Sequence, residues 1–211
     1  FKARLAWKSG QDGVSARATP VVANMNPQVD DIPEIMVGAY GSGNTGIIEF
    51  YRGDGSNQDS PMRLTIPGNF DLYPVPGPTV GDIDGDGKPE LLMSSYDRRI
   101  RVFHNYTENP TAPMTLWITS SSTLDEFDQR PYLADFDADG IPEVYAGNDV
   151  FLFDLSNPAA PTLSKAINGN SYSGQAHYDN SSQGATNSTA VDILTPAECN
   201  GDPDCNGLEL V

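Results

Sequence analysis

Positive charge is scarce in this chain of 211 residues, which carries 12 lysines and arginines against 29 aspartates and glutamates, a formal net charge of -17. Nucleic acids and anionic membranes attract basic surfaces, so this charge balance argues against either as a partner. No apolar run approaches the roughly 18 residues that a membrane-spanning helix needs. We therefore expect no membrane insertion in this segment.

Cysteine and histidine are also scarce. The two cysteines, Cys199 and Cys205, are too few for a zinc site and could instead close a small disulfide loop in an oxidising compartment. The two histidines, His104 and His177, have no obvious catalytic companion, and no nucleophile elbow, phosphate loop or HExxH motif is present. We expect no catalytic residues, although the sequence does not separate paired acids for glycoside cleavage from metal-binding acids.

Sustained helical periodicity is missing as well. The 20 glycines and 17 prolines divide the chain into short segments, many of them β-leaning. This pattern is typical of an all-β protein with many turns.

The most informative stretch is GDIDGDGKPELLM, residues 81–93. Three aspartates alternate, a glycine follows, and Glu90 begins an apolar strand-like run. Carboxylates packed this closely repel one another unless a cation lies between them, and hard oxygen ligands favour Ca²⁺. The predicted ligands are Asp82, Asp84, Asp86, the backbone carbonyl of Lys88, and Glu90.

The spacing recurs in ADFDADGIPEVYAG, 53 residues further along the chain. Here the predicted ligands are Asp135, Asp137, Asp139, the carbonyl of Ile141, and Glu143. An EF-hand would need an acid at position 12, where this chain has Met93 and Ala146, and would lead into a helix. We therefore predict two calcium-binding β-hairpin turns.

Four segments of the chain repeat with a period of about 55 residues. They are 19–40, 78–96, 130–147 and 188–211, and each reads as strand A, an acidic loop and strand B. A third strand C (46–51, 99–105, 149–155) and a fourth strand D follow in each complete unit. Four antiparallel strands per repeat is the pattern of a β-propeller blade.

We divide the chain accordingly into one propeller segment. Residues 1–18 would hold the last strand of a preceding blade and a linker. Residues 19–77, 78–129 and 130–187 would form complete blades, and 188–211 the first two strands of another. Closure as four blades would lack a strand C, so we expect a fragment of a longer propeller.

At DIDGDGKPELL and DFDADGIPEVY the sequence resembles the FG-GAP/VCBS repeat family, which includes integrin α-subunit propellers and secreted or surface proteins of microbes. The resemblance extends at blade level over nearly the whole chain. It implies a seven- or eight-bladed propeller with calcium in the A–B hairpins of one face. It says little about function, because the family includes adhesins, lectins and non-catalytic parts of enzymes.

Two further loops depart from this pattern, so the number of calcium sites could rise from two to four. The first is longer and less charged, and fewer carboxylates mean weaker binding. Its candidate ligands are Asn24, Asn26, Asp30 and Glu34. In the last loop the candidates are Asp192, Asp202, Asp204, Asn206 and Glu209, unless the cysteine pair holds this insertion without metal.

The loops at the opposite face of the propeller are candidates for ligand binding, because surface loops on a rigid scaffold commonly carry function. The candidate residues are Tyr40, Phe70, Tyr73, Tyr96, Arg98, Arg130, Tyr172 and His177. Alternatively, each tyrosine caps its own blade and each arginine pairs with a nearby aspartate. The sequons at Asn105, Asn180 and Asn187 are possible glycosylation sites.

Millimolar calcium outside cells suits loops of this type, so we expect an extracellular or cell-surface protein. We expect a non-catalytic role in adhesion or assembly through contacts with proteins, glycans or neighbouring subunits. The alternatives are a glycan-binding lectin module and the propeller of a secreted polysaccharide lyase.

Overall fold

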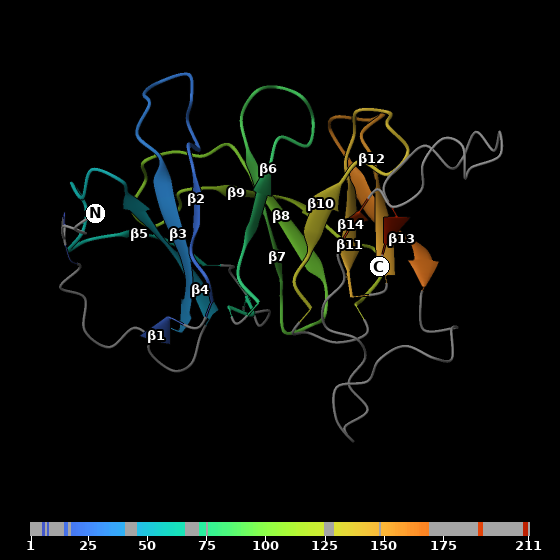
Figure 1. The fold of residues 1–211 in the computed structure, drawn as a ribbon, viewed down its shortest axis with the longest axis horizontal. Coiled ribbons are helices and arrows are strands. Elements are labelled where there is room, and N and C mark those ends of the chain that lie inside the picture. Colours follow the sequence, from blue (N-terminus) through green and yellow to red (C-terminus); the bar gives the residue numbers. More distant parts are fainter. Residues whose placement is uncertain are drawn as a thin grey trace.

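A computed structural model of the chain describes most of residues 15–168 and two short strands beyond them (Figure 1). The described residues are 6, 8, 15–16, 18–40, 46–65, 72–74, 76–124, 129–147, 149–168, 190–191 and 209–210. Within them the secondary structure is entirely β, without an α-helix, which confirms the all-β prediction. Accordingly, no helix in this part of the chain could cross a membrane.

Three antiparallel sheets follow one another along the chain, each with four strands in sequence order. The first contains β2 (Val21–Ala23), β3 (Glu34–Tyr40), β4 (Gly46–Arg52) and β5 (Met62–Leu64). The second contains β6 (Thr79–Gly81), β7 (Glu90–Ser94), β8 (Ile100–His104) and β9 (Thr115–Thr119). The third contains β10 (Tyr132–Ala134), β11 (Glu143–Ala146), β12 (Asp149–Asp154) and β13 (Thr162–Asn168). These are the A, B, C and D strands expected from the repeat.

Three short strands of the described residues lie outside these three sets of four. The strand β1 (Ser15–Ala16) pairs with the far end of β3, on the edge that β2 also occupies. The sequence did not predict this fifth strand of the first sheet. The strands β14 (Ala190–Val191) and β15 (Glu209–Leu210) pair with each other, as expected for the A and B strands of the last unit. The predicted strand in FKARLAWKS lies outside the described residues, apart from Ala6 and Lys8.

The sheets stand side by side and pack face to face (Figure 1). Strand β7 shows why, because all five of its residues are buried although neighbours in a strand point to opposite faces. Leu91 and Met93 belong to the apolar cluster shared with the first sheet. Leu92, between them, belongs to the cluster shared with the third sheet. The second sheet is therefore covered on both faces.

At the edge formed by the first strand of each sheet, β6 contacts both β2 and β10. Gly81 at the end of β6 permits this approach, since a Cβ there would lie 2.6 Å from Leu133 Cδ1. Arg130 adds polar contacts, donating from Nη2 to the carbonyl of Pro78 and from Nε to Thr79 Oγ1. Consecutive sheets are thus tied together along this edge.

Candidate metal centre

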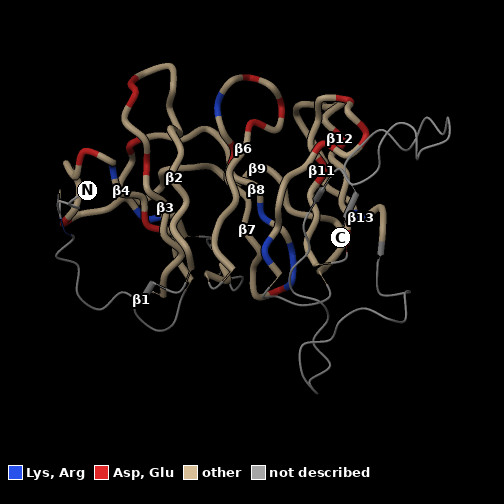
Figure 2. The backbone as a smooth tube through the Cα atoms, in the orientation of Figure 1, with Lys and Arg blue, Asp and Glu red and all other residues tan. Residues whose placement is uncertain are grey.

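The acidic loops between the first and second strands all lie at the same end of the three sheets (Figure 1). Figure 2 shows the acidic residues concentrated in these loops at the top of the view. Because a hairpin turn follows strand A in every sheet, the repeat itself brings the acidic loops to one side of the molecule.

The loop between β6 and β7 is held by its own aspartates. Asp84 Oδ1 accepts a hydrogen bond from the backbone N–H of Asp86 at 3.1 Å, and Asp86 Oδ1 accepts one from Lys88 at 2.7 Å. Asp82 Oδ2 accepts a third from Gly87 at 3.0 Å. The φ angle of Gly87 is +81°, a conformation that glycine adopts without strain. These contacts turn the loop around its carboxylates.

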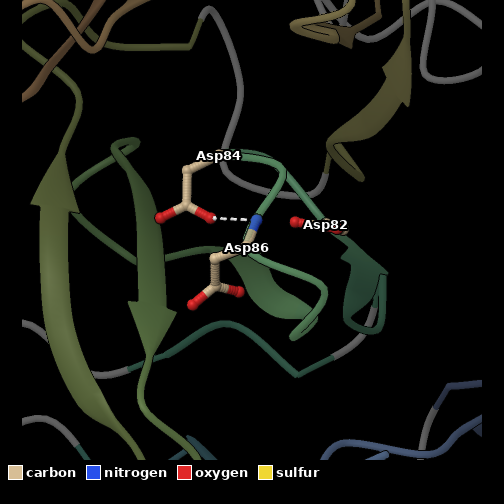
Figure 3. A group of neighbouring side chains, drawn as sticks. All are labelled: Asp82, Asp84 and Asp86. Carbon is tan, nitrogen blue, oxygen red and sulfur yellow. Dashed lines mark hydrogen bonds between the residues drawn. The ribbon is translucent and has the colours of Figure 1, made fainter.

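The three aspartates bring their carboxylate oxygens together. One oxygen each from Asp82, Asp84 and Asp86 lies within 4.8 Å of the others, with all three residues exposed (Figure 3). Like charges at this separation repel one another, and a bound cation would reverse that energy. The sequence prediction that these residues converge agrees with the geometry.

The buried residue at the end of this loop is Glu90. It is the first residue of β7, only 3% exposed, and its Oε2 accepts the backbone N–H of Ile83 at 2.8 Å. Burial is the main cause that raises the pKa of Glu90 from 4.5 to about 7, and the neighbouring aspartates raise it further. A cation in the loop would stabilise the ionised carboxylate that burial disfavours.

The loop between β10 and β11 repeats the arrangement. Asp135 Oδ2 accepts from Gly140 N at 3.1 Å, Asp137 Oδ1 from Asp139 N at 3.2 Å, and Asp139 Oδ1 from Ile141 N at 2.7 Å. Ligand oxygens of Asp135, Asp137 and the buried Glu143 lie within 4.8 Å of one another.

Two features of the loop between β10 and β11 bear on metal binding. Burial raises the pKa of Glu143, whose Oε2 accepts the backbone N–H of Phe136 at 2.7 Å. Asp135 Oδ1 is buried and has no hydrogen-bond partner. A buried carboxylate oxygen without a partner is costly, and a divalent cation with oxygen ligands would satisfy it. The donor set of both loops therefore fits calcium, and calcium would join strand A to strand B in each.

In the first loop, between β2 and β3, an arginine neutralises one of the acids. The glutamate of this loop makes the same kind of contact as Glu90 and Glu143, since Glu34 Oε2 accepts the N–H of Met25 at 2.8 Å. However, Asp30 Oδ2 lies 2.7 Å from Arg52 Nη2 and forms an ion pair. This contact lowers the pKa of Asp30. Of the four predicted ligands here, Asn24 bonds to backbone within the loop: its Nδ2 donates to the carbonyl of Asp30, and its Oδ1 accepts the backbone N–H of Asn26.

The predicted fourth site lies mostly outside the described residues. This applies to Asp192, Asp202, Asp204 and Asn206, and to the predicted disulfide between Cys199 and Cys205. Glu209 is the first residue of β15 and pairs with Val191. Glu34, Glu90 and Glu143 hold the same register position, each opposite the last residue of the preceding strand.

The residues predicted for the opposite face are only partly brought together. The hydroxyl oxygens of Tyr40 and Tyr96 lie 3.2 Å apart, and the ring of Tyr73 meets Tyr96 edge-on with centroids 4.9 Å apart. Arg98 is exposed in the same turn as Tyr96. Arg130 donates hydrogen bonds to Pro78 and Thr79 of the second sheet, as described above. Phe70, Tyr172 and His177 lie outside the described residues, as do the sequons at Asn180 and Asn187.

Two residues beside the acidic loops were missed by sequence reasoning. The role of Arg52 could not be read from the local sequence, because its contact with Asp30 spans 22 positions of the chain. Trp117 was assigned only to a strand, yet it stacks on His104 with ring centroids 5.1 Å apart and planes 6° apart. The sequon residue Asn105 follows His104 and is exposed, with a φ of +53°.

Residues 82–146 match the family model of the FG-GAP-like repeat, from the first aspartate of one acidic loop to the last residue of β11. Both well-formed acidic loops lie within the matched region, so the resemblance noted in the sequence is confirmed there. A search of curated proteins found no match to the chain.

Proposed function

We propose that this chain, in which residues 82–146 form an FG-GAP-like repeat, is a segment of a calcium-stabilised β-propeller. In this proposal the domain acts outside the cell in adhesion or assembly and has no catalytic role. The observation that carries the proposal is the pair of acidic loops with the same pattern of backbone-to-carboxylate hydrogen bonds at the same end of successive sheets. Repetition of a whole loop, with its buried glutamate, favours a structural metal site over a solvated acidic turn.

The propeller arrangement is supported by how the sheets pack. Successive sheets meet face to face, and their first strands lie side by side along one edge. The outer face of the third sheet still exposes apolar side chains, with Leu152 44% and Ile167 53% exposed. Exposed apolar residues on a sheet face favour a further sheet packed there. We propose that the segment belongs to a seven- or eight-bladed propeller.

The proposed number of calcium ions is two. The loops at Asp82–Glu90 and Asp135–Glu143 each offer carboxylate oxygens and a backbone carbonyl, the ligands that calcium prefers. When bound, calcium supplies positive charge that holds three carboxylates and strand A against strand B. In the first loop the Arg52 guanidinium already supplies a positive charge to Asp30, so we expect no third ion there.

Contact with a partner is proposed for the opposite face, where Tyr40, Tyr73 and Tyr96 gather. Aromatic side chains are enriched where proteins bind other proteins, and they can also stack on sugar rings. The rigid sheets beneath would present these rings in a fixed arrangement. An extracellular location accords with calcium loops of the class that bind in the range of about 10⁻⁴–10⁻³ M.

Calcium titration by calorimetry, paired with thermal melting, tests this proposal. We expect two ions per chain, and one ion in each of the variants Asp84→Asn and Asp137→Asn. EDTA should lower the melting temperature of the native chain. The matched control is Asp30→Asn in the first loop, which should destabilise the chain without changing the number of ions. A melt unchanged by EDTA would remove the structural role of the metal.

A further inference from the structure

An open pocket of about 230 Å³ lies beside the acidic loop of the second sheet. One wall is formed by that loop, through Asp84, Asp86, Lys88 and Glu90. The other walls come from the end of β8, from Trp117 of β9, and from Pro158 in the loop that follows β12 of the third sheet. The pocket therefore lies where two successive sheets meet, at the end that carries the proposed calcium.

A β-bulge places Trp117 in this pocket. Val102 pairs with Ile118 and Phe103 with Leu116, so Trp117 is the extra residue between two pairs. Bulges redirect a side chain from the alternation of the strand. As a result, Trp117 and its neighbour Ile118 both pack toward the cluster shared with the third sheet. The indole is then half-buried and stacked on His104.

The chemistry of the walls combines a flat aromatic surface with oxygen and nitrogen groups. Trp117 and His104 provide the aromatic surface. Carboxylates of the loop accept hydrogen bonds, while the Lys88 ammonium and the Asn105 amide can donate them. A sugar ring has the matching surfaces, because its C–H face is apolar and its hydroxyl groups both donate and accept. We propose that this pocket binds a saccharide.

The calcium of the proposed function adds to this match, and the inference rests on that proposal. Calcium takes about six to eight oxygen ligands, and the loop offers five ligand residues. One or more positions therefore remain for water or for hydroxyl groups of a ligand. Four of the five ligand residues line the pocket, namely Asp84, Asp86, Lys88 and Glu90.

The charge and size of the pocket limit its ligand. A cationic side chain of a partner would suit the carboxylates alone, but calcium would offset their charge, and the Lys88 ammonium lies 3.6 Å from Asp86. Pockets for drug-sized ligands measure about 300–1,000 Å³. The smaller pocket here fits a single sugar unit, such as the end residue of a glycan, better than an extended oligosaccharide.

The test uses the whole chain produced without N-glycosylation, so that no sugar on Asn105 occupies the pocket. The probes are methyl glycosides of common hexoses and N-acetylhexosamines, titrated by tryptophan fluorescence in saturating calcium and again in EDTA. Trp7→Phe removes the other tryptophan signal. We expect saturable binding in calcium that is lost in EDTA.

The variant Trp117→Ala lacks the reporting tryptophan, so it is titrated with the same glycosides by calorimetry beside the native chain. It should bind saccharide about tenfold or more weakly, because the aromatic contact is removed. Its matched control is Leu116→Ala, the exposed neighbour on the same strand, which should bind as the native chain does. Calorimetry must show that both variants still bind calcium, which also reports that they are folded.

The outcomes separate the two proposals. Calcium binding without a response to any glycoside would overturn the saccharide pocket and leave the calcium proposal standing. Saccharide binding that is equal in EDTA would overturn the part assigned to calcium. Binding that survives Trp117→Ala would place the sugar elsewhere, and preferential binding of an arginine- or lysine-containing peptide would replace the saccharide with a cation.

Discussion

Replacing Glu90 with glutamine should change the stability of the chain in opposite directions with and without calcium. Glu90 is almost fully buried and its carboxylate accepts the backbone N–H of Ile83. Glutamine has nearly the same shape and keeps an acceptor for this hydrogen bond. The variant Glu90→Gln therefore removes the charge and replaces a carboxylate of the proposed metal site with a neutral amide, while changing little else.

The magnitude follows from the pKa of Glu90, which rises from 4.5 to about 7 in the folded chain. A carboxyl group with a raised pKa binds its proton more tightly when folded, so in EDTA the stability falls as pH rises from 4.5 to about 7. A shift of about 2.5 units corresponds to about 3 kcal/mol. Glutamine resembles the protonated acid at every pH. Without calcium, the variant should therefore be more stable than the native chain by up to about 3 kcal/mol above pH 7.

Calcium should reverse this order. An ion present at about 1,000 times its dissociation constant stabilises the folded state by about 4.1 kcal/mol, which exceeds the advantage of about 3 kcal/mol that the variant has without calcium. The variant offers a neutral amide oxygen in place of the Glu90 carboxylate, so it should bind calcium more weakly and gain less stability from it than the native chain does.

The assay is a thermal or urea melt of both chains at about pH 5 and about pH 8.5, each in EDTA and in calcium, so that contributions of other groups cancel in the difference. For a chain of this size, about 3 kcal/mol corresponds to a melting shift of about 6–12 °C. The control is Glu34→Gln in the first loop, whose difference in stability from the native chain should be the same in EDTA and in calcium. If Glu90→Gln is less stable than the native chain in EDTA at the higher pH, the account of Glu90 as a destabilising buried charge is wrong.

Three substitutions test other parts of the argument, each by chemical denaturation. Arg52→Gln should cost about 1–2 kcal/mol with and without calcium, because Asp30 loses its cation; a cost present only in EDTA would contradict this. Arg130→Ala should cost about 2 kcal/mol through its lost bonds between the second and third sheets, including that to Pro78, and an unchanged midpoint would show that these bonds add nothing. Ala138→Gly, in the loop between β10 and β11, should stabilise the chain by about 1 kcal/mol, because Ala138 has a φ of +59° that glycine adopts without strain. Destabilisation by this substitution would mean that other contacts compensate the strain.

Much of the fold could be predicted because the sequence repeats. The alternation of acids in residues 82–90 and 135–143 identified two hairpin loops, and the apolar runs on each side identified their strands. The prediction that strands C begin near residues 46, 99 and 149 agrees with β4, β8 and β12. Local patterns of this kind are readable because a period of two fixes which side chains share a face.

Contacts between distant segments could not be predicted in the same way. The bulge at Trp117 depends on how β8 and β9 align, and one residue of shift moves a side chain to the other face. The tyrosine cluster joins Tyr40, Tyr73 and Tyr96 from three different segments. Arg130, a candidate for the ligand-binding face, donates to the carbonyl of Pro78 in the neighbouring sheet. In each case the role of the residue depends on a contact with a residue that is distant in the sequence.

The position opposite each buried glutamate explains why similar loops need not bind the same ion. Glu34 pairs with Arg52 in the register of β3 and β4. Continuing the registers of the other two sheets by one residue places His104 opposite Glu90 and Leu152 opposite Glu143. Arginine always carries a positive charge, whereas leucine never does, so among the three described loops only the first has a permanent cation opposite its glutamate. The number of acidic loops in such a repeat is thus an upper bound on its calcium ions, and the residue on strand C decides how many of them need the metal.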